Sequence, residues 1–455
     1  MRLGSIIDYA RSQFATFDVI PFNDVDAAIF AQLSYAQLTE PFTTFASSNT
    51  ALLESKQAKA QASTLVHYFQ RVKNWLAHKP QNPVQLEDEE RFTSLYQAFY
   101  HAEDFSLTFS SEASREQMVE LITAMIGSPR YRDVQVGEFV YQFNEERYNN
   151  EQFAAMTFLL PDGTEYISLR GTEATFVGWR EDFQLAFDDV IPSQISAVSY
   201  VNTIARRSHH PLIIGGHSKG GNTAVYAAVH CDDDVRSRIQ HIYTFDGPGS
   251  MTDIMQSQEF KDISHRLTKL VPQESFIGMM FEYTEPYQVI HSNATGINQH
   301  FLFSWDVDLD SDDFVHDDAL TVSADNLSSA YIAWTNTMDR QERREIIDAM
   351  FAIVEASGYD NFTDLANNIS ISAPAMWQKF RSLDEDERAK LVDPFTNLFA
   401  KIFHFNWATS MMNPATWSTP DLQSSSVVKS LASLTDRIID AVTPTDTTHD
   451  ADSNE

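Results

Sequence analysis

Short runs of β-branched and aromatic residues, separated by polar turns, mark the middle of the chain. Three such runs, at 137–143, 153–160 and 165–170, predict strands. The last two are joined by the sequence Pro-Asp-Gly at 161–163, which favours a tight turn, so we expect a hairpin there.

After this hairpin the pattern alternates between helix and strand. Apolar residues at helical spacing occupy 194–207 and 222–230, whereas continuous apolar runs occupy 212–214 and 242–245. Strands that alternate with helices form parallel sheets, because each helix crosses the face of the sheet to bring the next strand alongside. We therefore predict an α/β fold with a mostly parallel central sheet. Further strands are expected at 287–291 and 301–305.

Helical patterns flank this region on both sides. Apolar residues recur at i, i+3 and i+4 in 24–36 and 113–126, and amphipathic helices are predicted at 339–358 and 386–405. The segment 51–110 is polar and predicts surface helices and loops. The expected organisation is an α/β domain that includes the N-terminal helices, a C-terminal helical extension and a polar, disordered tail, over 1–318, 319–442 and 443–455.

The composition narrows the range of partners. The chain has 455 residues, 64 of them acidic and 32 basic, so its formal net charge is −32. The charge is spread evenly, −22 over 1–318 and −10 over 319–455. This excess of carboxylates argues against nucleic acids and anionic membrane surfaces as partners, because both repel it.

The cysteine content and the lack of long apolar runs indicate the cellular compartment. A single cysteine, Cys231, excludes an intramolecular disulfide and a multi-cysteine zinc site. No signal peptide is visible, and no apolar run reaches about 18 residues, the length that suggests a spanning helix. We therefore expect a soluble, cytoplasmic protein without a transmembrane segment.

The glycines gather around one serine. Of 15 glycines in the chain, four lie at 215, 216, 220 and 221. The segment 216–220, Gly-His-Ser-Lys-Gly, is a G-x-S-x-G sequence between an apolar strand and a helix pattern. In that context a nucleophilic serine stands at a strained turn, and small neighbours relieve the crowding. Ser218 is therefore the predicted nucleophile, and the start of the following helix favours negative charge beside it.

A serine hydroxyl needs a base, and the base needs an acid that orients it. Asp246 directly follows a predicted strand and precedes a Gly-Pro-Gly turn, so it is the preferred acid; Glu274, after a possible strand at 266–270, is the alternative. For the base we prefer His300, in a loop that follows a flexible segment. His291 is the other downstream candidate, but it ends a strand pattern, and His217 is too close to the serine to turn back towards it.

The oxyanion of acyl transfer requires two backbone donors. Lys219, the residue after the nucleophile, is expected to supply one through its N–H, and Thr172, in the Arg-Gly-Thr sequence after a strand, the other. We expect no metal or organic cofactor.

A run of aspartates and a stripe of aromatic residues are weaker indications of function. Aspartates alternate at 306, 308, 310 and 312 as in a calcium loop, but Ser311 stands where an EF-hand needs glycine, so we predict an acidic surface loop. Aromatic residues at helical spacing between 395 and 407 predict a helix that packs on its own domain, with a lid or a lipid-facing surface as the alternative.

Several of these blocks resemble a bacterial family of lipase-like α/β-hydrolases that is distantly similar to the class 3 lipases. RGTEATFVGWREDF (170–183), GGHSKGGNTAVYAA (215–228) and FDGPG (245–249) carry the resemblance, with further blocks at 21–35 and 299–305.

The resemblance implies an α/β-hydrolase fold over most of 1–318, with Ser218 as nucleophile and the Arg-Gly-Thr sequence on the oxyanion side. It also favours His300, since such lipases keep their base shortly before a tryptophan-containing strand. The acid stays open, because class 3 lipases usually place it one strand later than Asp246, near Glu274, whereas some other lipases use the earlier strand.

We therefore predict a serine ester hydrolase of lipase or esterase type, which forms an acyl-enzyme on a neutral small-molecule or lipid ester. A thioesterase, acyltransferase or peptidase with the same triad is the alternative among enzymes. A hydrolase-fold protein that binds or scaffolds through its C-terminal helices is the alternative of another class.

Overall fold

The computed structural model describes residues 1–36, 88–100, 112–145, 150–249, 253–281, 286–385, 387–388 and 391. The chain divides into two compact units, Met1–Ile347 and Asp348–Glu455. The expected boundary after residue 318 therefore falls inside the first unit. The predicted aromatic helix at 395–407, the tail at 443–455 and most of the polar segment 51–110 lie outside the described residues.

The first unit is built on a nine-stranded mixed sheet with the order β12-β9-β8-β7-β6-β5-β4-β3-β2. The strands are β2 (Phe92–Ser94), β3 (Gln135–Asn144), β4 (Glu151–Leu159), β5 (Glu165–Leu169), β6 (Leu212–His217), β7 (Ile239–Phe245), β8 (Leu267–Pro272), β9 (Gln288–Ile290) and β12 (His316–Asp317). Neighbouring strands from β5 to β9 pair in parallel. The strands outside this central part, β2 to β4 on one side and β12 on the other, pair antiparallel.

The predicted hairpin between β4 and β5 is confirmed. Gly163 has φ 84° at its turn, and its N–H donates to the Leu160 carbonyl at 2.9 Å. The predicted strand at 301–305 is wrong. Leu302–Ser304 form a single turn of 3-10 helix, and the Trp305 indole N–H donates to the Gln299 carbonyl at 2.8 Å, so this segment folds back on itself.

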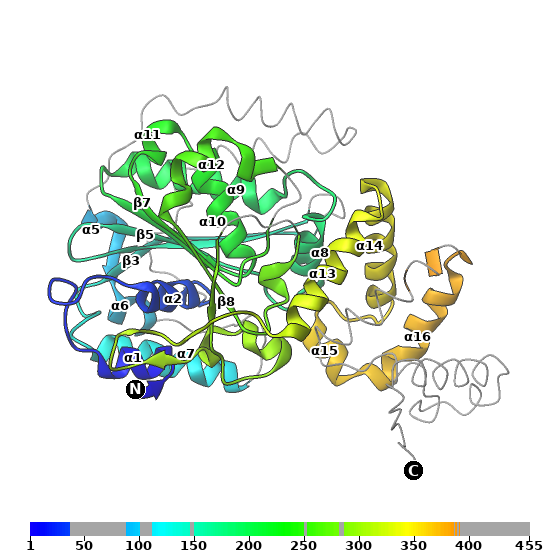
Figure 1. Cartoon of the computed structure of the whole chain (residues 1–455), viewed down its shortest axis with the longest axis horizontal. Helices are drawn as coiled ribbons and strands as arrows, with labels where there is room; N and C mark the ends of the chain where they lie inside the picture. The colour runs from blue at the N-terminus through cyan, green and yellow to red at the C-terminus, as the bar shows by residue number, and fades with distance from the viewer. Residues whose placement is uncertain are drawn as a thin grey trace, which may run out of the picture. The chain divides into compact units, whose positions relative to one another are not determined.

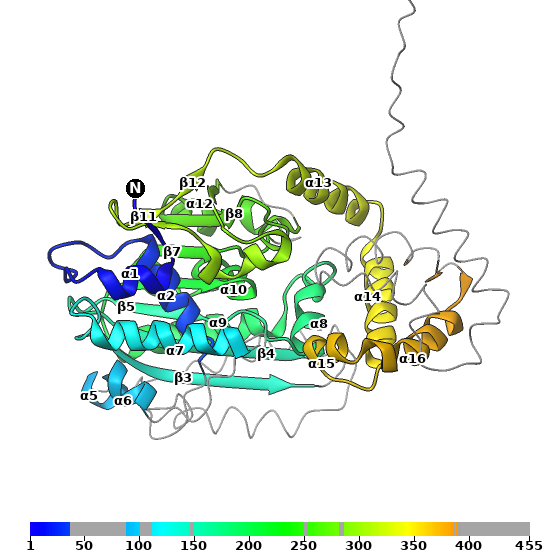
Figure 2. The ribbon, with the colours of Figure 1, turned by 90° about the horizontal axis from the view of Figure 1, so that it is seen from below.

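Helices cover both faces of the sheet (Figures 1 and 2). Those of the first unit are α1 (Ile6–Ser12), α2 (Asp24–Leu33), α5 (Asp88–Arg91), α6 (Leu95–Tyr100), α7 (Glu112–Gly127), α8 (Phe176–Gln184), α9 (Pro192–Arg207), α10 (Lys219–His230), α11 (Asp233–Arg236), α12 (Gln258–Ile263) and α13 (Val322–Asn336). Side chains of α1, α2, α6 and α7 share one buried cluster with Phe158, Tyr166 and Tyr243 of the sheet. Those of α9, α10 and α12 share another with Ile167, Ile214 and Ile242. Two separate apolar faces are what helix-connected parallel strands require, because successive side chains point to opposite faces.

Capping fixes where the two N-terminal helices begin. Ser5 and Asp8 form a reciprocal capping box at α1, and Asn23 and Asp26 form one at α2. Asp26 is fully buried and also binds the Arg130 guanidinium, at 2.5 and 2.8 Å. These contacts set the start of α2, whose C-terminal turn reaches the candidate site described below.

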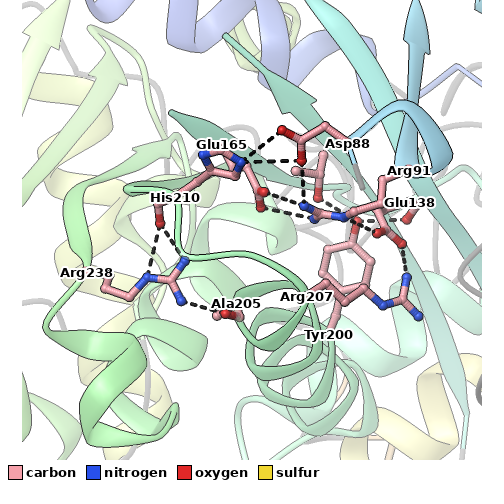
Figure 3. Close-up of polar contacts among 10 residues, drawn as sticks. Asp88, Arg91, Glu138, Glu165, Tyr200, Ala205, Arg207, His210 and Arg238 are labelled. Carbon is pink, nitrogen blue, oxygen red and sulfur yellow. Dashed lines mark hydrogen bonds and ion pairs between the residues drawn. The ribbon is translucent and has the colours of Figure 1, made fainter. Parts of the chain in front are cut away.

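A buried ionic network holds the amino ends of the central strands (Figure 3). Arg91 is fully buried and binds both carboxylate oxygens of Glu165, at 2.7 and 3.3 Å, together with Glu138 at 2.8 Å. Glu138 also pairs with Arg207. If α5 left the sheet, Arg91 would leave with it and the buried carboxylates of Glu138 and Glu165 would lose its compensating charge. The network therefore fixes α5 to the sheet. It lies at the opposite ends of the strands from Ser218.

A small three-stranded sheet, of β1 (Leu3–Gly4), β10 (Val307–Asp308) and β11 (Asp313–Phe314), carries the acidic segment. The expectation of an acidic surface loop fits Asp310, which pairs with the N-terminal ammonium at 3.2 Å. It is wrong for Asp306, which is buried and accepts a hydrogen bond from the Asn293 amide at 2.8 Å. Asp306 thus belongs to the packing around the loop that carries His300.

The second unit contains the end of α14 (Arg340–Glu355), α15 (Phe362–Asn367) and α16 (Ile369–Ser382). Helix α14 matches the amphipathic pattern at 339–358, and Gly358 beyond it has φ 81°. Across the described residues, every helix is too short or too polar to span a bilayer.

Candidate active site

Ser218 stands at the sharp turn between β6 and α10. Its backbone has φ 58° and ψ −132°, a conformation that costs a non-glycine residue about 1–3 kcal/mol. The turn is held by Ser218 N–H donating to the Phe245 carbonyl and by the Ser218 carbonyl accepting from Gly221 N–H, both at 2.9 Å. A Cβ on Gly220 would lie 2.1 Å from the Leu169 carbonyl oxygen, so only glycine fits this close approach to β5.

Asp246 directly follows β7, the strand next to β6 in the sheet, and also has a positive φ of 48°. Its carboxylate is 1% exposed, and both oxygens are in use. Oδ2 lies 2.6 Å from His300 Nδ1, while Oδ1 accepts from the Ser275 hydroxyl at 2.5 Å and the Gly278 N–H at 3.1 Å. The carboxylate is thereby fixed in one orientation towards the imidazole.

This contact determines which ring nitrogen of His300 carries the proton. A carboxylate only accepts hydrogen bonds, so Nδ1 of His300 carries the proton that it donates to Asp246. In the neutral ring, Nε2 is then left with a lone pair. His300 and Ser218 line the same cavity of about 230 Å³. No hydrogen bond joins the Ser218 hydroxyl to this imidazole, although both side chains reach the cavity.

Glu274 forms no hydrogen bond or ion pair with His300. Its Oε2 accepts from the Gly296 N–H at 2.5 Å, and its own N–H donates to the Gln299 side chain at 2.8 Å. Glu274 therefore shapes the loop that carries the histidine rather than the imidazole itself. The other downstream candidate, His291, directly follows β9 and binds Asp317 of the edge strand β12 at 3.0 Å.

His217 has a positioning contact that the sequence did not predict. Its Nε2 lies 2.7 Å from the His300 carbonyl oxygen, and its Nδ1 lies 2.8 Å from the Tyr35 hydroxyl. Because a carbonyl only accepts, Nε2 of His217 carries the proton and Nδ1 accepts from Tyr35. Burial, and secondarily the charge of His300, lower the pKa of His217 well below its usual value, so the ring is neutral. The histidine beside Ser218 thus ties the loop that carries His300 to the elbow.

The Arg-Gly-Thr segment lies against the elbow. A Cβ on Gly171 would lie 2.5 Å from the His217 carbonyl oxygen and 3.0 Å from Ser218 Cβ. Thr172 lines the cavity, and its hydroxyl donates to Asp182 Oδ2 at 2.5 Å. Its side chain is therefore held by Asp182, a partner that no sequence pattern indicated.

Lys219 presents its two nitrogens to different surroundings. Its ammonium is buried beside Glu181, with Nζ 2.6 Å from Oε2, and also donates to the Gln152 carbonyl at 2.9 Å. Its backbone N–H is the first of α10, a position without an intrahelical acceptor. The ammonium is thus neutralised by Glu181, whereas the amide remains at the elbow.

Replacement of Asp182 by asparagine should change the pH dependence of stability. Burial raises the pKa of Asp182 to about 6, although Lys219 and the Thr172 hydroxyl oppose the shift. As the pH falls, the folded protein therefore takes up a proton on this carboxyl at a higher pH than the unfolded chain does. As the pH rises from about 4 to 6, the carboxyl ionises in the folded state at a cost, and the free energy of unfolding decreases. We expect urea unfolding to show Asp182→Asn gaining stability relative to wild type across this range, by about 1–3 kcal/mol at pH 7.

A matched control is Asp189→Asn. The Arg340 guanidinium lowers the pKa of Asp189, so its ionised form favours the folded state and the variant should not gain stability as the pH rises. A difference between Asp182→Asn and wild type that stays constant from pH 4 to 7 would contradict the assignment of the raised pKa to Asp182.

One group of metal-binding side-chain types occurs among the described residues. Single ligand atoms of Asp88, Glu165 and His210 lie within 4.8 Å of one another. Both oxygens of Glu165 already bind Arg91, and His210 Nε2 lies 3.1 Å from Asp88 (Figure 3). The nearby guanidinium opposes a cation at this point, so the group is part of the ionic network and is separate from the cavity.

Two solved lipase structures are similar to part of this chain. The M37 lipase crystal structure is 14% identical, with 42% of this chain and 68% of that chain covered and a TM-score of 0.28. The Rhizomucor miehei lipase in its propeptide complex is 15% identical, with 46% and 68% covered and a TM-score of 0.29. No curated protein matches the sequence.

A family match covers the part of the chain that holds the site. The sequence profile of the Mbeg1-like family matches residues 125–352, which is half of the 455 residues and includes the elbow, Asp246 and His300. The chain therefore belongs to the Mbeg1-like family.

Proposed function

We propose that the protein is a serine ester hydrolase in which Ser218 is the nucleophile, His300 the base and Asp246 the orienting acid. The observation that carries the proposal is the 2.6 Å contact between His300 Nδ1 and Asp246, on an imidazole that lines the same cavity as a serine with φ 58°. A buried carboxylate, an imidazole that it orients and a strained serine at one cavity are the parts that acyl transfer needs.

The reaction follows from these positions. His300 Nε2 takes the proton from Ser218 as its oxygen attacks the ester carbonyl carbon, and Asp246 stabilises the imidazolium that forms. The backbone amides of Lys219 and Thr172 donate to the oxyanion of the tetrahedral intermediate. The imidazolium then protonates the leaving alkoxide, and a water molecule, deprotonated by the same histidine, releases the acyl group from the serine.

The surroundings of the site support a serine rather than another nucleophile. Cys231, the only cysteine, is buried away from the cavity, and burial raises the pKa of its thiol to about 12, so it is not a nucleophile at neutral pH. The Lys219 ammonium is paired with Glu181. Parallel strands that place Ser218 and Asp246 at their carboxyl ends fit a hydrolase fold of the lipase-like type that the sequence resembles.

The proposal is tested by labelling with a fluorophosphonate probe. The native protein should react, and mass spectrometry of its peptides should place the adduct on Ser218. Heat-denatured protein serves as the control, because a serine is activated only in the folded site. If the folded protein fails to label, the proposed reaction is wrong and a binding role for the cavity is favoured.

A further inference from the structure

Gln32 has a polar side chain without a partner on the wall of the cavity. It lies in the last turn of α2, and its residue is only 8% exposed. Within the described parts of the chain, no residue donates to or accepts from its side-chain amide. It lines the cavity together with Ser218 and His300.

The amide of Gln32 is open to the cavity, where water or a ligand can hydrogen-bond to it. A ligand that displaces this water must replace its hydrogen bonds, because otherwise the amide is left unsatisfied. The neighbours of Gln32 in α2, Ala31 and Leu33, are fully buried apolar residues, so the helix itself does not require an amide there. The side chain is instead positioned for a ligand that enters the cavity.

The rest of the wall indicates which ligand fits. Lys, Arg, Asp and Glu are missing from the described residues that line it, so a charged group would lose its hydration without gaining a counter-charge. Aromatic rings of Trp179, Phe301 and Phe303 provide apolar contact. The other three carboxamides on the wall are exposed and therefore available to solvent, namely Gln117, Asn293 and Asn298.

We propose that Gln32 recognises a hydroxyl group on the substrate, so that the preferred substrate is a neutral ester with a hydroxyl close to the scissile bond. A carboxamide both donates and accepts, and a hydroxyl does the same, so one hydroxyl can satisfy both ends of the Gln32 side chain. The inference rests on the proposed function and adds the substrate class and a specificity-determining residue.

The test compares two esters that differ only in hydroxyl groups, 2,3-dihydroxypropyl butyrate and propyl butyrate. Wild type should favour the dihydroxy ester in kcat/KM. Gln32→Met, which keeps the size and removes the amide, should lower kcat/KM for the dihydroxy ester about tenfold and that for propyl butyrate by less than about twofold. Gln32→Asn, which retracts the amide, should lose the same preference.

Controls separate this effect from changes in packing. Gln258→Met, on the exposed surface of α12, should leave both rates and their ratio unchanged. Thermal unfolding of each variant shows whether it is folded. An equal loss on both esters in a folded Gln32 variant, an unchanged ratio, or a wild type without preference would each overturn the inference.

Failure of the proposed function gives a different result. If wild type hydrolyses neither ester but still reacts with the fluorophosphonate at Ser218, the substrate class is wrong and the nucleophile stands. If it neither hydrolyses nor labels, the proposed hydrolase reaction itself is overturned.

Discussion

Replacement of Ser218 by alanine is expected to lower kcat for p-nitrophenyl butyrate by at least about 10³-fold, because the oxygen that attacks the ester carbonyl is removed and no acyl-enzyme can form. Fluorophosphonate labelling should disappear in the same variant. The remaining rate would come from the Lys219 and Thr172 amides, which still polarise the ester carbonyl. Residual labelling in Ser218→Ala would place the nucleophile on another side chain.

The same position allows a test of the strained backbone. With φ 58° and ψ −132° at residue 218, glycine fits without strain and alanine does not. Ser218→Gly should therefore be more stable than Ser218→Ala, by about 1 kcal/mol in urea unfolding. Both variants lack the hydroxyl and should be equally inactive, so stability and activity are measured independently.

Ser199, inside α9, is the matched control. There the backbone is helical, so Ser199→Gly should be less stable than Ser199→Ala by about 1 kcal/mol. The order of the two variants is thus expected to reverse between positions 199 and 218. The same order at both positions would show that the turn in solution is not the one described.

Local patterns predicted the elbow because its causes are local. A strand, four glycines and a helix follow one another within residues 212–230, and the close approach of Gly220 to β5 needs only the next strand in the sheet. The hairpin at 161–163 is predictable for the same reason. In both cases the turn itself is formed by residues adjacent in the chain.

The contacts that surround the elbow depend on residues far apart in sequence. Gly278 N–H and the Ser275 hydroxyl orient Asp246, and both come from the segment after β8. The Gly-Pro-Gly sequence after Asp246 indicates a turn, but it does not indicate the positive φ of the aspartate itself. Trp305, predicted in a strand, instead donates to Gln299 and closes the loop around His300. Such pairings depend on tertiary packing, which the spacing of apolar residues along the sequence does not predict.

The choice between Asp246 and Glu274 as the acid can be decided by isosteric amides. Asp246→Asn should lower kcat for p-nitrophenyl butyrate by about 10³–10⁴-fold, comparable to the loss when the acid of a serine hydrolase triad is changed to its amide. Glu274→Gln should lower it by less than about threefold, because its oxygen can still accept from the Gly296 N–H and it has no hydrogen bond to the imidazole. Thermal unfolding should show both variants folded.

The size of the first effect follows from the other partners of Asp246. Its Oδ1 accepts from Ser275 and Gly278, so in Asp246→Asn the amide oxygen stays on those two donors and the NH₂ group turns to His300. An NH₂ group only donates, so Nδ1 must then accept and the proton moves to Nε2. A protonated Nε2 cannot take the proton of Ser218, and the base is held in the wrong tautomer. Ser275→Ala in the asparagine background removes one of the two donors and allows the amide to rotate, so it should restore part of the rate. If Glu274→Gln rather than Asp246→Asn proves to be the inactive variant, the acid is Glu274.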